Sequence, residues 1–408
     1  MTTARIHPIT FLSAMVGLAA MSAAQPASTT QGTSAINQRT VYRSGEGYAT
    51  YRIPAAIVTP KGALLAFCEG RAAPSDTGDI DLVVKRSTDN GHTFTDAQIV
   101  WSDDANTCGN PCPVVDETTG TIWLLMTHNL GVDHEKEIIA GTSKGTRTVW
   151  ITSSDDDGIT WTKPRDITAS VKKPDWSWYA TGPGIGIQLE RGVKAGRLVI
   201  PCDYILRDSS GNKGNSHVVY SDDHGKTWQI GGEPSDMAFN ESQVVELSDG
   251  RLMLNMRNHR SGANDETPRE RGVAISEDGG ETFESYRRDP ALIEPICQAS
   301  ILRYSWPDGG TASQILFSNP ASIKDRARMT VRLSVDEGKT WPAEKLIYAG
   351  GSAYSSLVKL PDGSIGLLYE AWNDQRYERI DFARFTLEWL TRKVMSCDLP
   401  SIQEKAHG

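Results

Sequence analysis

An eight-residue motif, Ser-x-Asp-x-Gly-x-Thr-aromatic, occurs five times in this chain and restricts its fold more than any other feature. The copies occupy residues 87–94, 154–161, 221–228, 276–283 and 334–341, and their starts are 67, 67, 55 and 58 residues apart. Asp and Gly favour tight turns, while Ser and Thr hydroxyls bond the nearby backbone. Each copy therefore predicts a β-hairpin tip whose aromatic side chain points inward, and we assign the motif a structural role.

A second repeat alternates with the first and consists of six hairpins. Each hairpin has a head residue or tripeptide, an apolar strand, a turn glycine and a second apolar strand, as in AYSSLVKLPDGSIGLLYE at 353–370. The heads are Arg52, Asn110, Gly182-Pro183-Gly184, Glu241, Gln298 and Tyr354. Two interleaved hairpin signals with a period of 50–70 residues are typical of a β-propeller with four-stranded blades.

The sequence thus predicts an all-β fold, a six-bladed β-propeller over residues 39–400. The sixth blade lacks its own copy of the motif, so it would close the ring with the chain before Arg52 or after Asp381. Helix is expected only near residues 401–407.

The propeller geometry also predicts where function lies. The innermost strands of a propeller start at one end of its axis, so the six heads should meet there. The second strand of each hairpin runs back to the same end of the axis. We therefore expect Arg71, Arg257 and Arg326 to border the site that the heads form.

Composition excludes some classes of function. The 408 residues include 42 Lys and Arg against 51 Asp and Glu, a net charge of −9, which argues against a nucleic-acid partner. No Cys-x-x-Cys pair or spaced histidine cluster is present, so we expect no metal site. Of the six cysteines, Cys108 and Cys112 are close enough for a small bridge, whereas Cys68, Cys202 and Cys297 are expected as buried thiols.

The N-terminus has the pattern of a secretory signal. Arg5 precedes an apolar run at 11–21 and then small residues that a signal peptidase accepts. We therefore expect a signal peptide at 1–24, a flexible lead-in at 25–38 and a secreted or periplasmic protein. A retained anchor is the alternative, although the run is too short to span a bilayer and no later stretch could do so.

The head residues indicate an anionic ligand and covalent chemistry. Several arginines at one point suit a carboxylate, whose geometry matches the guanidinium fork. A tyrosine is a poor nucleophile unless a neighbouring carboxylate takes its proton. It becomes useful where the substrate carries a carboxylate on its reacting carbon, because a second carboxylate at about 4 Å would cost on the order of 4 kcal/mol. Sialic acids are sugars of this kind.

The chain resembles the exo-α-sialidases (neuraminidases), in particular the secreted bacterial type. The matching segments are Tyr51-Arg52-Ile-Pro, Glu69-Gly-Arg71, Asp76-Thr-Gly-Asp79-Ile-Asp81, Glu241, Asn255-Met-Arg257, Arg326, Thr330-Val-Arg332-Leu-Ser and Tyr354-Ser-Ser-Leu. With the five Ser-Asp turns, called Asp-boxes, they cover residues 40 to about 390. The Asp-box alone is shared with other propellers.

This resemblance implies a role for each candidate residue. Arg52, Arg257 and Arg326 would hold the substrate carboxylate. Tyr354 would be the nucleophile and Glu241 its base.

Three further residues complete the implied site. Asp76 would protonate the leaving oxygen and later activate water. Arg71 would border the ring substituents, and Asn110 stands where the family often has an acidic residue, so it keeps hydrogen bonding without charge. The implied reaction is retaining hydrolysis of terminal α-linked sialic acids on glycoproteins, glycolipids and oligosaccharides, without cofactor or membrane insertion.

Two other functions stay open, a transferase or intramolecular variant and a non-catalytic carbohydrate-binding propeller. A different glycosidase on such a propeller would have no use for three converging arginines. Residues that compete with the assigned ones, and that we expect to be structural, are Asp79, Asp81, Arg328, Arg332, Glu246 and Glu370. Further candidates for the pocket wall are Trp176, Trp178, Tyr179, Asp203 and Met256.

Overall fold

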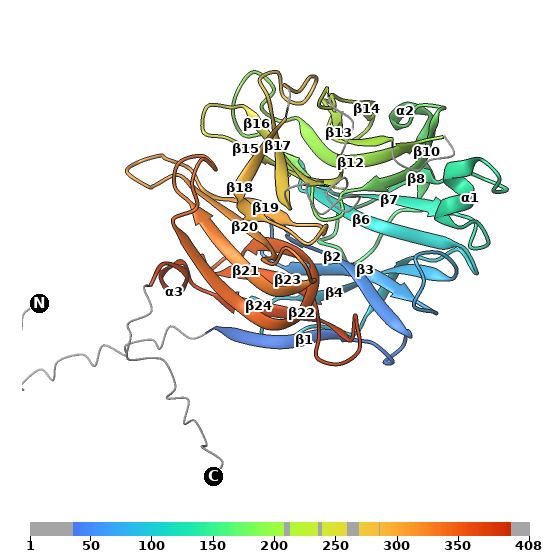
Figure 1. Cartoon of the computed structure of the whole chain (residues 1–408), viewed down its shortest axis with the longest axis horizontal. Helices are drawn as coiled ribbons and strands as arrows, with labels where there is room; N and C mark the ends of the chain where they lie inside the picture. The colour runs from blue at the N-terminus through green and yellow to red at the C-terminus, as the bar shows by residue number, and fades with distance from the viewer. Residues whose placement is uncertain (1–35, 208–212, 236–238, 259–268, 285, 393–408) are drawn as a thin grey trace, which may run out of the picture. The chain divides into compact units, whose positions relative to one another are not determined.

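The computed structural model describes residues 36–207, 213–235, 239–258, 269–284 and 286–392, which belong to one compact unit (residues 34–408). Within these residues the chain forms four sheets, grouped around a common centre, and three short helices (Figure 1). The all-β expectation is confirmed. The predicted signal peptide and the predicted helix at 401–407 lie outside the described residues, and so does nearly all of the predicted lead-in.

The first sheet has eight strands. These are β2 (Thr50–Val58), β3 (Leu64–Arg71), β4 (Ile80–Ser87), β5 (Gln98–Trp101), β6 (Thr107–Val115), β7 (Ile122–Asn129), β8 (Thr148–Ser154) and β9 (Arg165–Asp166). Pairing is antiparallel except for one contact between β4 and β6. This sheet therefore holds two consecutive meanders, β2 to β5 and β6 to β9, joined at a single point.

The next two sheets are smaller. The second contains β10 (Trp176–Thr181), β11 (Ile187–Gln188), β12 (Leu198–Leu206), β13 (Gly214–Ser221) and β14 (Gln229–Ile230). The third contains β15 (Phe239–Glu246), β16 (Leu252–Asn258), β17 (Glu270–Ser276) and β18 (Arg287–Ile293). Both are antiparallel.

The last sheet joins the two ends of the described chain. It contains β19 (Ser300–Ser305), β20 (Gln314–Pro320), β21 (Ala327–Ser334), β22 (Ala343–Lys359), β23 (Ile365–Trp372), β24 (Arg379–Phe385) and β1 (Asn37–Arg43). β1 begins inside the predicted lead-in and pairs with β24. Both predicted segments thus take part in the last sheet, because β1 comes from the chain before Arg52 and β24 includes the chain after Asp381. The helices are α1 (Glu135–Ala140), α2 (Thr168–Val171) and α3 (Leu387–Thr391).

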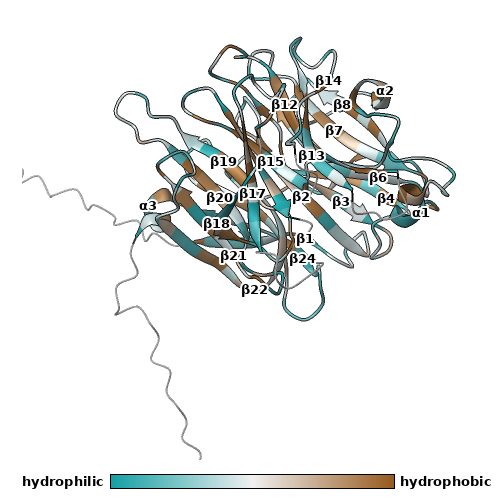
Figure 2. Ribbon diagram, turned by 45° about the horizontal axis from the view of Figure 1, so that its top comes forward, coloured by the Kyte–Doolittle hydropathy of each residue, from teal (hydrophilic) through white to brown (hydrophobic). Residues whose placement is uncertain are grey.

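The five repeated motifs form the expected turns. In the first copy, the Ser87 hydroxyl donates to Asp89 Oδ1 at 2.7 Å and accepts from the backbone N of Gly91 at 2.9 Å, while Asp89 accepts from Thr93. Gly91 has a φ of +80°, and a Cβ there would meet the Phe382 ring at 2.2 Å. The aromatic residue that ends each motif packs against a core cluster. Hydrophobic segments accordingly lie within the strands (Figure 2).

Four of the strands that begin the hairpins share a bulge at the same place. The register shifts between Arg52 and Ala55 in β2, Gly109 and Cys112 in β6, Phe239 and Ser242 in β15, and Ser352 and Ser355 in β22. At each shift the register advances by three residues on one strand and by only two on its partner. Such a bulge re-aims the side chains beside it, and these are the positions of four predicted heads.

The bulge in β6 also rules out the small disulfide between Cys108 and Cys112. Both residues are free and buried, as are Cys68, Cys202 and Cys297. The extra residue reverses the side-chain alternation. Cys108 therefore packs in the cluster of Leu124, whereas Cys112 packs in that of Leu125.

Membrane-spanning helices and metal-binding groups were both expected to be absent, and the structure bears on them only within the described residues. In that part of the chain, no helix has the length and apolar character needed to cross a membrane. The same residues hold no group of three His, Cys, Asp or Glu side chains that could bind a metal ion.

Candidate active site

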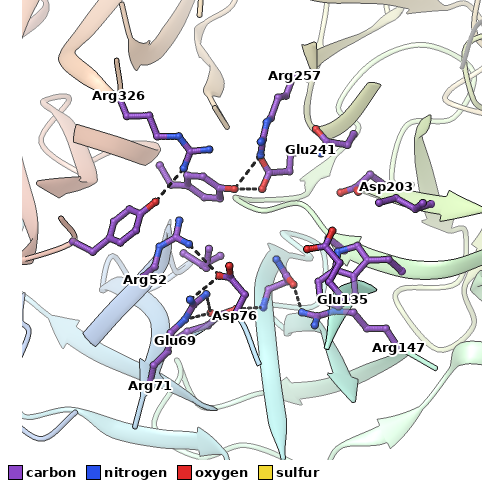
Figure 3. A pocket seen from close by; sticks show the side chains of 18 residues that line it. Arg52, Glu69, Arg71, Asp76, Glu135, Arg147, Asp203, Glu241, Arg257 and Arg326 are labelled. Atoms are coloured by element: carbon purple, nitrogen blue, oxygen red, sulfur yellow. Dashed lines mark hydrogen bonds and ion pairs between the residues drawn. The ribbon is translucent and has the colours of Figure 1, made fainter. Parts of the chain in front are cut away.

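A polar pocket of about 280 Å³ lies beside four of the predicted head residues, Arg52, Asn110, Glu241 and Tyr354. Figure 3 shows arginine and carboxylate side chains from many elements pointing into it. All eight predicted site residues line it, namely Arg52, Arg71, Asp76, Asn110, Glu241, Arg257, Arg326 and Tyr354. The remaining lining residues are Ile53, Glu69, Glu135, Arg147, Trp178, Ala180, Asp203, Ile205, Asn240 and Tyr377.

Tyr354, Glu241 and Arg257 form a hydrogen-bonded group at the pocket floor. The Tyr354 hydroxyl donates to Glu241 Oε1, and Arg257 Nη1 donates to Glu241 Oε2 at 2.5 Å and to the Tyr354 oxygen at 3.2 Å. Burial, reinforced by the charge of Glu241, raises the pKa of the Tyr354 phenol well above its ordinary value. Burial alone would raise the pKa of Glu241, but Arg257 and the phenol lower it overall. A neutral phenol therefore faces an ionised carboxylate.

Arg52 is held in place by Glu370, which is fully buried at the end of β23. Arg52 donates to Glu370 from Nε at 3.1 Å and from Nη2 at 3.4 Å. Glu370 also accepts from the backbone N of Ile53 at 3.0 Å and of Tyr354 at 3.1 Å. One carboxylate thus fixes the bulges of β2 and β22 together, which confirms the supporting role expected for Glu370.

Arg326 reaches the pocket from the loop between β20 and β21. Its Nη2 donates to the carbonyl oxygen of Ile296 at 2.9 Å and its Nη1 to the Tyr377 hydroxyl at 3.1 Å. The guanidinium groups of Arg326 and Arg52 lie 5.6 and 5.0 Å from the centre of the Tyr354 ring. With Arg257, three cations therefore surround one phenol.

Asp76 lies in the loop between β3 and β4, at the edge of the same cluster. Its Oδ1 accepts from Arg71 Nη1 at 2.7 Å and from Arg52 Nη1 at 3.2 Å. Asp76 is exposed at its surface but partly shielded from water by the cluster, which would raise its pKa; the charges of Arg71 and Arg52 outweigh this and lower the pKa to about 2. Arg71 is in turn held by Glu69, to which its Nε donates at 2.8 Å. Asp76 is therefore an ionised carboxylate in this arrangement.

The other end of the pocket mixes one arginine with further carboxylates (Figure 3). Asn110 Oδ1 accepts from Arg147 Nη2 at 2.5 Å, and the Arg147 guanidinium lies 4.1 Å from the Trp178 ring centre. Burial raises the pKa of Glu135. Burial, together with the charge of Glu241, raises the pKa of Asp203 well above its ordinary value. Asp203 Oδ1 has no hydrogen-bond partner among the described residues. This end suits hydrogen-bonding groups of a polar ligand.

Two of the six predicted heads do not line the pocket. Gln298 donates to the carbonyl oxygens of Pro183 and Ser355, both at 3.0 Å. A Cβ at Gly184 would meet the Gln243 side chain at 2.4 Å. The Gly-Pro-Gly segment and Gln298 therefore fill the centre instead of contributing to the wall.

Three more of the competing residues, Glu246, Arg332 and Asp81, make structural contacts in this arrangement. Glu246 accepts from the backbone N of Glu190 at 2.7 Å, and Arg332 pairs with Glu344 at 3.2 Å. Asp81 bonds the Tyr48 hydroxyl at 2.6 Å, where backbone contacts were expected. Trp176, Tyr179 and Met256 are core residues, so Trp178 and Asp203 are the further candidates that reach the pocket.

Sequence reasoning missed several lining residues. Glu69 could have been found, because it precedes Arg71 by two positions on β3 and therefore shares its side of the strand. Arg147 directly precedes β8, and Tyr377 lies in the turn between β23 and β24. Neither position carries a repeat signal.

Comparisons with known proteins identify the family. A family model described as a BNR repeat-like domain matches residues 62–367. A sialidase of Micromonospora viridifaciens is 39% identical over 85% of this chain and 53% of its own length. An exo-alpha-sialidase of Aspergillus fumigatus is 34% identical over 85% of this chain and 86% of its own length. The chain therefore spans about half of the first relative and most of the second.

A solved structure gives the same result. The Hadza microbial sialidase Hz136 superposes with a TM-score of 0.75 and 31% identity, covering 86% of this chain and 69% of that chain. Fold and sequence together define an all-β protein of the BNR repeat-like class. The chain belongs to the sialidase family of glycoside hydrolases.

Proposed function

We propose that this protein is an exo-α-sialidase that hydrolyses terminal α-linked sialic acids with retention of configuration. The observation that carries the proposal is the Tyr354 hydroxyl on Glu241 inside a ring of three arginines. Arg52, Arg257 and Arg326 would bind the carboxylate of the sugar. That carboxylate sits on the anomeric carbon, so the bound carbon would face the phenol oxygen.

In the first step, the protonated Asp76 carboxyl gives its proton to the glycosidic oxygen as the bond from that oxygen to the anomeric carbon breaks. The Tyr354 oxygen bonds to the same carbon while Glu241 takes the phenolic proton. Asp76 must therefore gain a proton in the complex. A substrate carboxylate beside Arg52 supplies a negative charge that raises the pKa of Asp76.

In the second step, Asp76 is a carboxylate and removes a proton from water. The water oxygen attacks the anomeric carbon, the bond to Tyr354 breaks, and Glu241 returns the proton to the phenolate. Two displacements at one carbon restore its configuration. The arginines hold the carboxylate throughout, and no step requires a metal or cofactor.

The proposed scaffold is a six-bladed propeller. Four strands would form each blade, and β22 would serve two blades, because its first part pairs with β21 and its second part with β23. β1 would complete the last blade beside β24. We also propose that the protein is exported through the predicted signal at 1–24. Export fits a substrate found on glycoproteins, glycolipids and oligosaccharides.

Digestion of an α2,3-linked sialyl-lactose followed by proton NMR tests the reaction. We expect free sialic acid whose first-formed anomer is α, with the β anomer growing later by mutarotation. A first-formed β anomer would exclude the retaining mechanism. An anhydro sugar or transfer to added lactose would instead favour the intramolecular or transferase variant, and unchanged substrate would reject the activity.

A further inference from the structure

Tyr377 is a half-buried aromatic residue that contacts two of the three clustered arginines. The guanidinium of Arg52 lies 3.9 Å from the centre of its ring. Its hydroxyl oxygen accepts a hydrogen bond from Arg326 Nη1 at 3.1 Å. Arg52 comes from β2 and Arg326 from the loop before β21, so one side chain in the turn between β23 and β24 joins two distant segments.

The backbone at Tyr377 is strained and firmly held. Its φ is +64°, a left-handed value that is unusual for an aromatic residue. The Ser44 hydroxyl donates to the carbonyl oxygen of Tyr377 at 2.7 Å, and the Trp372 ring packs edge-on against its ring at 5.4 Å. Strain of this kind persists only where surrounding contacts impose it, and it gathers at functional sites.

Arg326 depends on this contact more than its neighbours do. Arg52 pairs with Glu370 and Arg257 with Glu241, but no ion pair among the described residues involves Arg326. The guanidinium of Arg326 donates hydrogen bonds to the Ile296 carbonyl and to Tyr377. Tyr377 thus orients this arginine without neutralising its charge, which leaves the charge available to an anion.

We propose that Tyr377 is a positioning residue that fixes the spacing and orientation of Arg52 and Arg326 so that both can bind one sugar carboxylate. Its ring supports the face of the first guanidinium while its hydroxyl anchors the second. The inference rests on the proposed function, because it assigns the carboxylate of the substrate to these two arginines.

Binding of a matched pair of ligands tests the proposal. The 2,3-unsaturated analogue of sialic acid carries the carboxylate, and its methyl ester replaces that charged group with a neutral one at the cost of one added methyl group. For Tyr377→Phe we expect the acid to bind about tenfold more weakly, because one hydrogen bond to a charged group is lost. For Tyr377→Ala, which also removes the ring, we expect about a hundredfold weakening. The ester should change by less than about twofold in Tyr377→Phe, a split that a general structural defect would not produce.

Tyr348→Phe is the matched control. The Tyr348 hydroxyl donates to the Trp372 carbonyl at 2.9 Å, so it holds the same turn from outside the pocket. This variant should keep the wild-type preference for the acid over the ester. An equal loss in Tyr348→Phe would mean that the turn as a whole, and not Tyr377, sets the preference, and this would overturn the proposal.

The remaining outcomes separate this inference from the proposed function. If the wild-type protein prefers the acid and Tyr377→Phe preserves that preference in full, the positioning role is wrong and the proposed function stands. If the wild-type protein itself shows no preference for the acid, the proposed carboxylate site is wrong, and the inference is lost with it.

Discussion

Replacing Glu370 with glutamine should destabilise the whole fold and not only the pocket. The Glu370 side chain is fully buried and accepts four hydrogen bonds, two from Arg52 and one each from the backbone N of Ile53 and Tyr354. Glutamine has nearly the same shape, but it lacks the charge and turns one acceptor into an NH₂ donor that faces N–H groups. Arg52, with 7% of its surface exposed, would lose its buried counter-ion.

The expected size of the effect follows from this environment. Breaking a buried ion pair by removing one partner costs about 3–5 kcal/mol. Asp76 remains near Arg52, but its side chain is 65% exposed and compensates for little of the loss. Urea unfolding followed by tryptophan fluorescence should therefore show a free energy of unfolding lower by about 3–5 kcal/mol.

Glu344→Gln is the matched control for this measurement. Glu344 also pairs with an arginine, Arg332 at 3.2 Å, but its side chain is 63% exposed. Its replacement should cost less than about 1 kcal/mol. If Glu370→Gln unfolds within about 1 kcal/mol of the wild-type protein, the reasoning that this carboxylate ties β2 to β22 is refuted.

Three further predictions concern catalysis. Tyr354→Phe should lower kcat by roughly three orders of magnitude or more while sialic acid analogues still bind, as nucleophile removal does in other enzymes; near-normal turnover would disprove its role. Arg326→Ala should weaken binding of the acid analogue by about tenfold or more, measured by calorimetry, because a charge-assisted contact is lost. Equal affinity would show that Arg326 does not bind the carboxylate. Glu241 must be ionised to accept a proton, and Arg257 and the phenol hold its pKa below the ordinary range of a glutamate, so the loss of kcat/KM caused by protonation of Glu241 should begin only at a pH below that range; a loss on acidification that begins within the ordinary range would contradict this.

The repeated turns made much of the fold predictable. The Ser and Asp of each eight-residue motif bond the backbone within four residues of themselves, so the turn is specified by local sequence. The strands between the turns follow from alternating apolar residues. β1, from the chain before Arg52, pairs over a long sequence separation with β24, which includes the chain after Asp381, so both segments that could complete the last sheet take part in it.

The site was predictable for a related reason. Equivalent positions of a repeat come together in space, so the repeat alignment is sufficient to group Arg52, Asn110, Glu241 and Tyr354. The same rule predicted too many residues for the pocket wall. Gln298 occupies an equivalent position, yet it donates to the Pro183 and Ser355 carbonyls and does not line the pocket.

The sequence by itself determined the β hairpins, the set of head residues and the chemistry these residues can perform, because turn propensities and side-chain types are local properties. Only the tertiary structure decided that the β6 bulge sends Cys108 and Cys112 to different clusters and that Tyr377 reaches Arg52 and Arg326. Side-chain direction depends on bulges, left-handed turns and contacts between segments hundreds of residues apart. No local pattern in the chain encodes those.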